Sequence, residues 1–100
     1  MPQGRRALTL EERGIAKRLQ AMPNVGPATA EDLVLLGITS VTDLADKDPE
    51  ALWAGIEAID GVPHDPCVRD VFAACIDYAR TGVPRKWWEF TPERGGRRRP

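Results

Sequence analysis

The residues with the clearest chemical potential form one short loop and the start of the segment that follows it. The candidate residues are Asn24, Val25, Gly26, Ala28 and Thr29. We expect Gly26 to permit a sharp bend, because it has no β-carbon, and Val25 to point inward and pin the loop. Pro27 suits the first turn of a following helix, since its missing N–H would be unpaired there anyway. The amides of the loop and of this helix then point outward together and form a site for an anion, such as a nucleic-acid phosphate, without reading base sequence.

Four cationic side chains could add to the attraction for phosphate. They are Lys17 and Arg18 before the loop, and Arg85 and Lys86 near the end of the chain. The net charge of −1 hides a basic start (residues 1–20, five bases and two acids), an acidic middle (21–79, two bases and eleven acids) and a basic end (80–100, seven bases and two acids). The basic ends could bind phosphates or neutralise the acidic middle, and composition does not choose between these roles.

The loop and its flanks also match a known pattern. Residues 19–33, LQAMPNVGPATAEDL, resemble the helix-hairpin-helix motif, in which a small residue such as Ala30 lies where two helices cross. Four residues depart from a DNA-binding hairpin: Asn24 replaces the first glycine, Pro27 removes one amide donor from the anion site, and Glu31 and Asp32 stand where such hairpins commonly offer a lysine. Two alternatives to DNA binding therefore stay open, a structural turn that binds nothing and a module that binds another protein.

The string His64-Asp65-Pro66-Cys67 contains three types of metal ligand, but the set is incomplete. A zinc site needs three or four converging protein ligands, and Cys75 lies eight positions along the same predicted helix from Cys67, too far for a shared site or a disulfide. We expect Asp65 to cap the helix and both cysteines to be small buried residues. A Cys67 nucleophile with His64 would lack a third group, so we expect no enzyme, no metal and no cofactor.

Residues 85–90, RKWWEF, combine two bases with three aromatic side chains. The aromatic rings could stack on unpaired bases while the cations hold phosphates. Alternatively, Trp87, Trp88 and Phe90 fold back and close the bottom of the core, since a domain of this size needs the buried area. We favour core closure.

Helices must position all of these residues. Thr9 and Glu12 form a capping-box pattern ahead of a helix whose apolar stripe continues to Met22. The predicted helical segments span residues 10–22, 27–36, 41–45, 49–60 and 66–81. No segment alternates with period two, so we predict an all-α, compact five-helix domain. Two similar helix–loop–helix units, with loops 37 residues apart, predict two pseudo-symmetric hairpins packed face to face.

Length and composition are typical of one globular domain. The chain has 100 residues, of which 42% are hydrophobic and 29% charged. We expect a flexible N-terminus over residues 1–8, a domain over 9–92 and a flexible basic tail over 93–100. No apolar run approaches the roughly 20 residues of a membrane span, and the start of the chain lacks an apolar secretory signal. With reduced cysteines, these features predict a cytoplasmic protein that does not enter a membrane.

Four blocks of sequence, taken in order, are similar to one small bacterial family. They are MPNVGPATAEDL (22–33), LGITSVTDL (36–44), HDPC (64–67) and PRKWW (84–88). Over roughly residues 15–92 the chain resembles the "pathogenicity locus" helix-hairpin-helix family, whose members are often labelled mitomycin-resistance proteins. The resemblance implies a compact helical domain, like SAM and recombinase N-terminal domains, with DNA binding and a role in DNA repair or damage resistance. It implies no catalytic mechanism.

Overall fold

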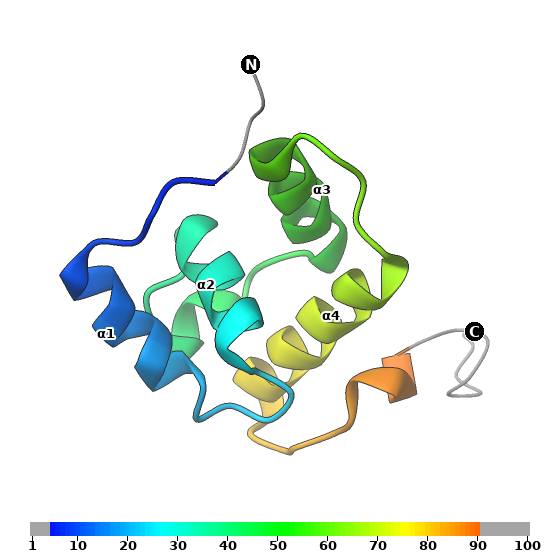
Figure 1. Cartoon of the computed structure of the whole chain (residues 1–100). Helices are drawn as coiled ribbons and strands as arrows, with labels where there is room; N and C mark the ends of the chain where they lie inside the picture. The colour runs from blue at the N-terminus through cyan, green and yellow to red at the C-terminus, as the bar shows by residue number, and fades with distance from the viewer. Residues whose placement is uncertain (1–4, 91–100) are drawn as a thin grey trace.

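The computed structural model describes residues 5–90, and this part of the chain is helical with connecting loops (Figure 1). The elements are α1 (Leu10–Leu19), α2 (Pro27–Leu35), the 3₁₀ helix η1 (Val41–Leu44), α3 (Pro49–Asp60), α4 (Pro66–Thr81) and the 3₁₀ helix η2 (Trp87–Phe90). The all-α prediction is confirmed. The predicted count of five helices is corrected to four α-helices within the described residues. The fifth predicted segment is the single turn η1, whose four residues have room only for i→i+3 bonding.

Residues 1–4 and 91–100 lie outside the described part of the chain, and the predicted basic tail over 93–100 lies there too. The prediction of a flexible start therefore stays a prediction for residues 1–4. Residues 5–8 form no helix, yet Leu8 packs against the core and Arg5 makes ion pairs that are described below.

The helix ends follow from local chemistry that the sequence already displays. Thr9 forms the predicted capping box at the start of α1. Asp48 and Asp65 each accept a hydrogen bond from a backbone amide two residues further on, and each precedes a proline in the first turn of its helix. Gly61 and Gly82 end α3 and α4 with φ 73°, the left-handed conformation that glycine adopts without a steric cost.

The end of α1 differs from the prediction. The apolar stripe predicts a helix up to Met22, but α1 ends at Leu19, and the chain then turns through i→i+3 hydrogen bonds. Met22 is still buried, because the turn folds it under the helix rather than continuing the helical stripe. The helical spacing of Met22 therefore predicts its burial correctly, but it does not predict its backbone conformation.

One hydrophobic core joins the four α-helices and η1. Its fully buried members include Leu19, Leu33, Leu44, Ile56 and Phe72. Helix α1 packs on α2 and α3 packs on α4, while α4 also contacts both 3₁₀ helices. Among the described residues, no helix combines the length and the hydropathy that a membrane crossing needs.

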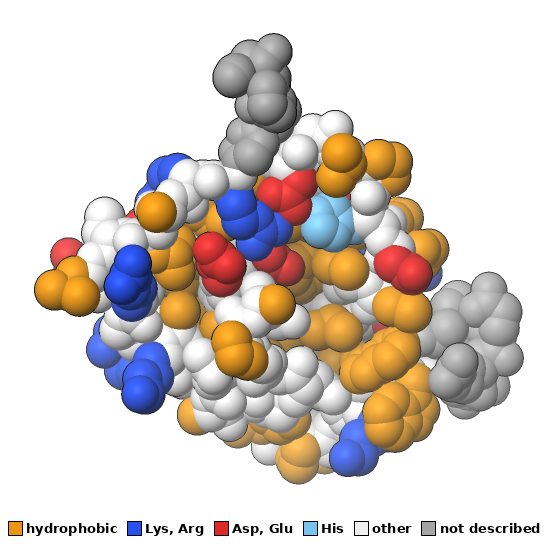
Figure 2. Space-filling view, in the orientation of Figure 1, with side chains coloured by type: hydrophobic (Ala, Val, Ile, Leu, Met, Phe, Trp, Pro, Cys, Tyr) orange, Lys and Arg blue, Asp and Glu red, His pale blue; other side chains and the backbone are white. Residues whose placement is uncertain are grey.

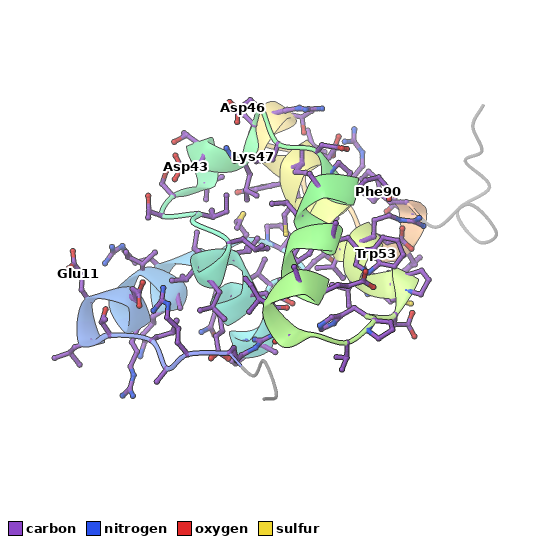
Figure 3. All side chains as sticks on the ribbon, turned by 90° about the horizontal axis from the view of Figure 1, so that it is seen from above. Glu11, Asp43, Asp46, Lys47, Trp53 and Phe90 are labelled. Carbon is purple, nitrogen blue, oxygen red and sulfur yellow. The ribbon has the colours of Figure 1, made fainter. Side chains whose placement is uncertain are left out.

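Helix α3 approaches the end of α2 closely at Gly55. A β-carbon at this position would lie 2.8 Å from a methyl group of Leu36. The glycine therefore brings the α3 backbone against the end of the first helical pair. Viewed from above, Trp53 and Phe90 lie on the side formed by α3, α4 and η2, and Glu11 lies at the opposite end on α1 (Figure 3).

Candidate phosphate-binding loop and its neighbours

The α1–α2 loop (residues 20–26) bends at a different residue from the one predicted. Asn24 adopts φ 72°, and it is the one non-glycine residue with positive φ in the described part of the chain. Gly26 has φ −96°, and a β-carbon there would meet nothing within 4 Å. The expectation that the bend requires glycine at 26 is therefore wrong, because Asn24 supplies the left-handed turn. Val25 is buried as predicted, and its N–H donates to the carbonyl of Met22.

The start of α2 leaves several backbone donors open. Gly26 occupies the N-cap position without a side-chain cap, and Pro27 follows it. The first bond of this helix runs from the Ala30 amide to the Gly26 carbonyl at 3.0 Å. Within residues 5–90, the amides of Gly26, Ala28 and Thr29 have no hydrogen-bond acceptor. Gly26 and Ala28 are also exposed, so these donors are available to an anion.

The two carboxylates after the loop are held elsewhere by a residue that sequence reasoning missed. Arg5 Nη1 lies 2.6 Å from Asp32 Oδ1 and 3.7 Å from Glu31 Oε1. The same guanidinium makes a two-pronged contact with Asp60 at 2.9 and 2.7 Å. Figure 2 shows blue and red side chains gathered where the start of the chain passes α2 and α3. These acids therefore neutralise Arg5 and do not cap the open amides of α2.

Burial and pairing move the pKa values of this charge cluster in opposite directions. Hydrogen bonding to Arg5 lowers the pKa of Asp60 to about 2, with His64 contributing and burial opposing. Burial raises the pKa of Asp32 above its ordinary value, although Arg5 partly offsets this shift. Arg5 itself has a raised pKa because Asp60 and Asp32 stabilise its charge. The cluster ties residues ahead of α1 to α2 and to the end of α3.

The Asp60 pair should make folding stability depend on pH. Unfolded Asp60 titrates near 3.8 and folded Asp60 near 2, so its contribution to stability is complete above about pH 4. It is lost as pH falls toward 2, because the unfolded carboxyl takes up a proton in this range, whereas the folded carboxylate is held by Arg5 and does so only near pH 2. Asp60→Asn should lower the free energy of unfolding at pH 7 and flatten its decline below pH 4. Urea titrations at several pH values measure both effects.

The exposed Asp46 provides the control for this prediction, since Asp46→Asn removes the same charge from a different surface. Its pH profile should follow that of the parent protein. An Asp60→Asn profile as steep as the parent's between pH 4 and 2 would contradict the role assigned to Asp60.

His64 belongs to this charge cluster and not to a site with Cys67. Its Nε2 lies 2.6 Å from Asp60 Oδ2, and its backbone N–H donates to Glu57 Oε2 at 2.7 Å. Asp65 caps α4 as predicted. The expectation that both cysteines are buried is wrong for Cys67, which is exposed in the first turn of α4, where the turn faces outward. No group of three metal-ligating side chains converges within the described residues.

Burial does hold for Cys75, and it raises the pKa of that thiol to about 12. Both cysteines are free. They lie eight positions apart on α4 and form no disulfide with each other, as predicted.

A C-terminal strap, residues 84–90, crosses the α1–α2 loop and is fastened to it by Asn24. The Asn24 side chain donates from Nδ2 to the Arg85 carbonyl at 2.7 Å and accepts at Oδ1 from the Trp87 amide at 3.2 Å. The strap also packs on α4 through η2. None of its three aromatic rings belongs to the core cluster or to the side chains packed against it; Trp87 and Phe90 are half-buried and Trp88 is exposed. The prediction that these rings close the core is therefore wrong, because the four-residue η2 packs on the outside of α4.

The four predicted cations occupy two separate places. Arg85 and Lys86 lie on the strap beside Asn24, where Arg85 pairs with Asp77 and Lys86 lies over the ring of Trp88. Lys17 and Arg18 are exposed in the last turn of α1, and neither makes an ion pair with a described residue. Blue side chains cluster on the α1 side of the molecule in Figure 2. Because Asn24 bonds to the backbone of the strap, Arg85 and Lys86 lie next to the loop. Lys17 and Arg18 lie on the preceding helix, α1.

Relatives of the chain are identifiable by sequence. The family model described as "Cdd1: Pathogenicity locus" matches residues 12–96. The protein named "Mitomycin resistance protein McrB" from Streptomyces lavendulae is 37% identical over 76 residues, which are 76% of this chain and 72% of that protein. No solved structure matches the chain significantly.

Proposed function

The chain belongs to the pathogenicity locus family, and we propose that it is a non-enzymatic DNA-binding domain that holds the phosphate backbone through its α1–α2 loop. The family assignment confirms the resemblance seen in the sequence. A role in damage resistance is part of the proposal, because the S. lavendulae relative is named for resistance to mitomycin.

One observation carries the proposal: three backbone amides at the start of α2, which belong to exposed or half-exposed residues, lack an acceptor within the described residues. The amides belong to Gly26, Ala28 and Thr29. Together with the positive end of the α2 dipole they form a site that favours a phosphate oxygen. Such contacts fix a protein on DNA without specifying sequence.

The charges around the loop support this proposal to different degrees. Lys17 and Arg18 carry charge that no described acid neutralises, so they can contribute long-range attraction. Arg85 is already paired with Asp77, so its contribution is smaller. Glu31 faces Arg5, which reduces the repulsion that this acid would exert on phosphate.

The finer fold that we propose is a pair of helix-hairpin-helix units. The packing of α1 on α2 and of α3 on α4 supports this arrangement. The second loop is followed by Asp65, whose side chain caps α4 and occupies the amide that an anion would need. The two units would therefore have different tasks, the first for phosphate and the second for support.

Gly26→Glu tests the proposal. The glycine has ordinary φ and open space around its β-carbon position, so the substitution should leave the fold intact. The new carboxylate would lie at the open amides, cap them and repel phosphate. Loss of one charge-assisted contact is worth about 1.5–3 kcal/mol, so affinity for duplex DNA should fall about tenfold or more. Fluorescence anisotropy at two salt concentrations measures the affinity and its salt dependence.

Ala54→Glu is the matched control, because it adds the same charge at an exposed position on α3, away from the loop. It should retain the parent affinity, and Gly26→Ala should do so as well. Equal weakening by the two glutamate variants would show that only net charge matters and would contradict a site at the loop. Failure of the parent protein to bind DNA at low salt would leave the protein-binding alternative as the better explanation.

A further inference from the structure

A pocket of about 320 Å³ lies between the α1–α2 loop and the C-terminal strap. It is lined by Pro23, Asn24, Pro84, Arg85, Lys86 and Glu89. The volume is at the small end of the range of ligand-binding pockets, which is enough for one flat ring system.

We propose that this pocket receives one unpaired nucleobase of DNA whose phosphate is held at the open amides of α2. This inference rests on the proposed function and adds a substrate preference to it. The protein would then bind DNA that contains single-stranded nucleotides more tightly than a blunt duplex.

The position of the pocket favours a base that belongs to the bound strand. Asn24 lines the pocket and is two residues from Gly26, so the two sites are separated by at most about 7 Å of chain. Neighbouring nucleotides along one strand are stacked about 3.4 Å apart in a duplex. A phosphate at the amides therefore places its own nucleotide, or the next one, within reach of the pocket.

The chemistry of the pocket fits the face and the edge of a base. Pro23 and Pro84 supply apolar ring surfaces for its flat faces. At the edge, Glu89 presents a carboxylate, of which Oε2 accepts from the Lys86 amide at 3.1 Å, while Oε1 has no partner within the described residues. Carboxylates accept from amino groups of bases, and Arg and Lys donate to base oxygens and ring nitrogens. The lining therefore offers both kinds of hydrogen bond.

An exposed aromatic side chain, Trp88, contacts Lys86, which lines the pocket. Trp88 is 41% exposed and stands edge-on to Trp87, with Lys86 over its ring. A second unpaired base could stack there, since aromatic side chains in single-strand sites are commonly interleaved with cations. Because Asn24 fastens the strap at two points, both surfaces are in place before DNA binds.

The test compares three labelled DNA probes at one salt concentration: a blunt duplex, the same duplex with a short single-stranded overhang, and that overhang made of abasic nucleotides. The parent protein should bind the normal overhang about tenfold more tightly than the blunt duplex, as base stacking predicts. The abasic overhang should lose this gain. Pro84→Met puts a longer side chain without an aromatic ring into the pocket, and should abolish the gain while retaining affinity for the blunt duplex.

Pro63→Met is the matched control, because it makes the same change at an exposed proline in the α3–α4 loop, and it should keep the gain. Equal affinity for blunt and overhanging duplex would overturn the pocket proposal and leave phosphate binding intact. A gain that survives in the abasic overhang or in Pro84→Met would overturn it as well. Loss of binding to every probe by the parent protein would instead overturn the proposed function and the pocket together.

Discussion

Replacing Phe72 with alanine is expected to lower the free energy of unfolding by about 3–5 kcal/mol. The ring is fully buried on α4 within the one core cluster, so its removal exposes no compensating surface and leaves a cavity. Small domains are stable by only about 5–15 kcal/mol, and the loss is therefore a large share of the total. Urea denaturation followed by circular dichroism measures the change.

Leu10→Ala is the control for this loss of apolar volume. Leu10 is 84% exposed at the start of α1, so its truncation should change the free energy of unfolding by less than about 0.5 kcal/mol. Similar destabilisation by the two variants would contradict the core as described. An intact Phe72→Ala protein with unchanged stability would do the same.

Helix boundaries were predictable where they depend on neighbouring residues alone. The Asp-Pro pairs before α3 and α4 and the glycines after them determine starts and stops through hydrogen bonds within one turn. The end of α1 was not predictable in this way. Met22 is apolar at helical spacing for reasons of burial, and periodicity does not distinguish a buried turn residue from another helical turn.

The contacts that shape the candidate site join residues far apart in the chain. Arg5 meets Asp60 across 55 positions, and Asn24 meets Arg85 across 61 positions. Neither contact has a local pattern, because a polar side chain carries no spacing rule that identifies a distant partner. The sequence therefore predicts an anion site at the loop. It does not predict that Glu31 and Asp32 pair with Arg5, or that the strap lies against the loop.

The position of the left-handed residue shows how a correct motif can suggest a wrong cause. From the motif, we predict that Gly26 forms the sharp bend and that Asn24 replaces the first glycine less well. In the structure Asn24 forms the bend, with φ 72°, and its side chain also makes both bonds to the strap. Asparagine is thus suited to this position for two reasons, since glycine would keep the bend and lose the strap.

Asn24→Ala should accordingly lower the free energy of unfolding through two separate losses. Alanine at φ 72° costs about 1–2 kcal/mol in backbone strain, and loss of two side-chain hydrogen bonds adds about 1 kcal/mol or more. The expected decrease in the free energy of unfolding is about 2–3 kcal/mol. Asn24→Gly removes the bonds but keeps the bend, and should lose only about 1 kcal/mol.

Amide hydrogen exchange separates the two contributions, because the Trp87 N–H donates to Asn24 Oδ1. Exchange at Trp87 should accelerate to a similar extent in Asn24→Ala and Asn24→Gly, whereas urea titrations should distinguish the variants by the backbone strain alone. Unchanged exchange at Trp87 would mean that the strap is held by its packing on α4 and not by Asn24. Equal stability of the two variants would mean that the bend relaxes at no cost when alanine replaces asparagine.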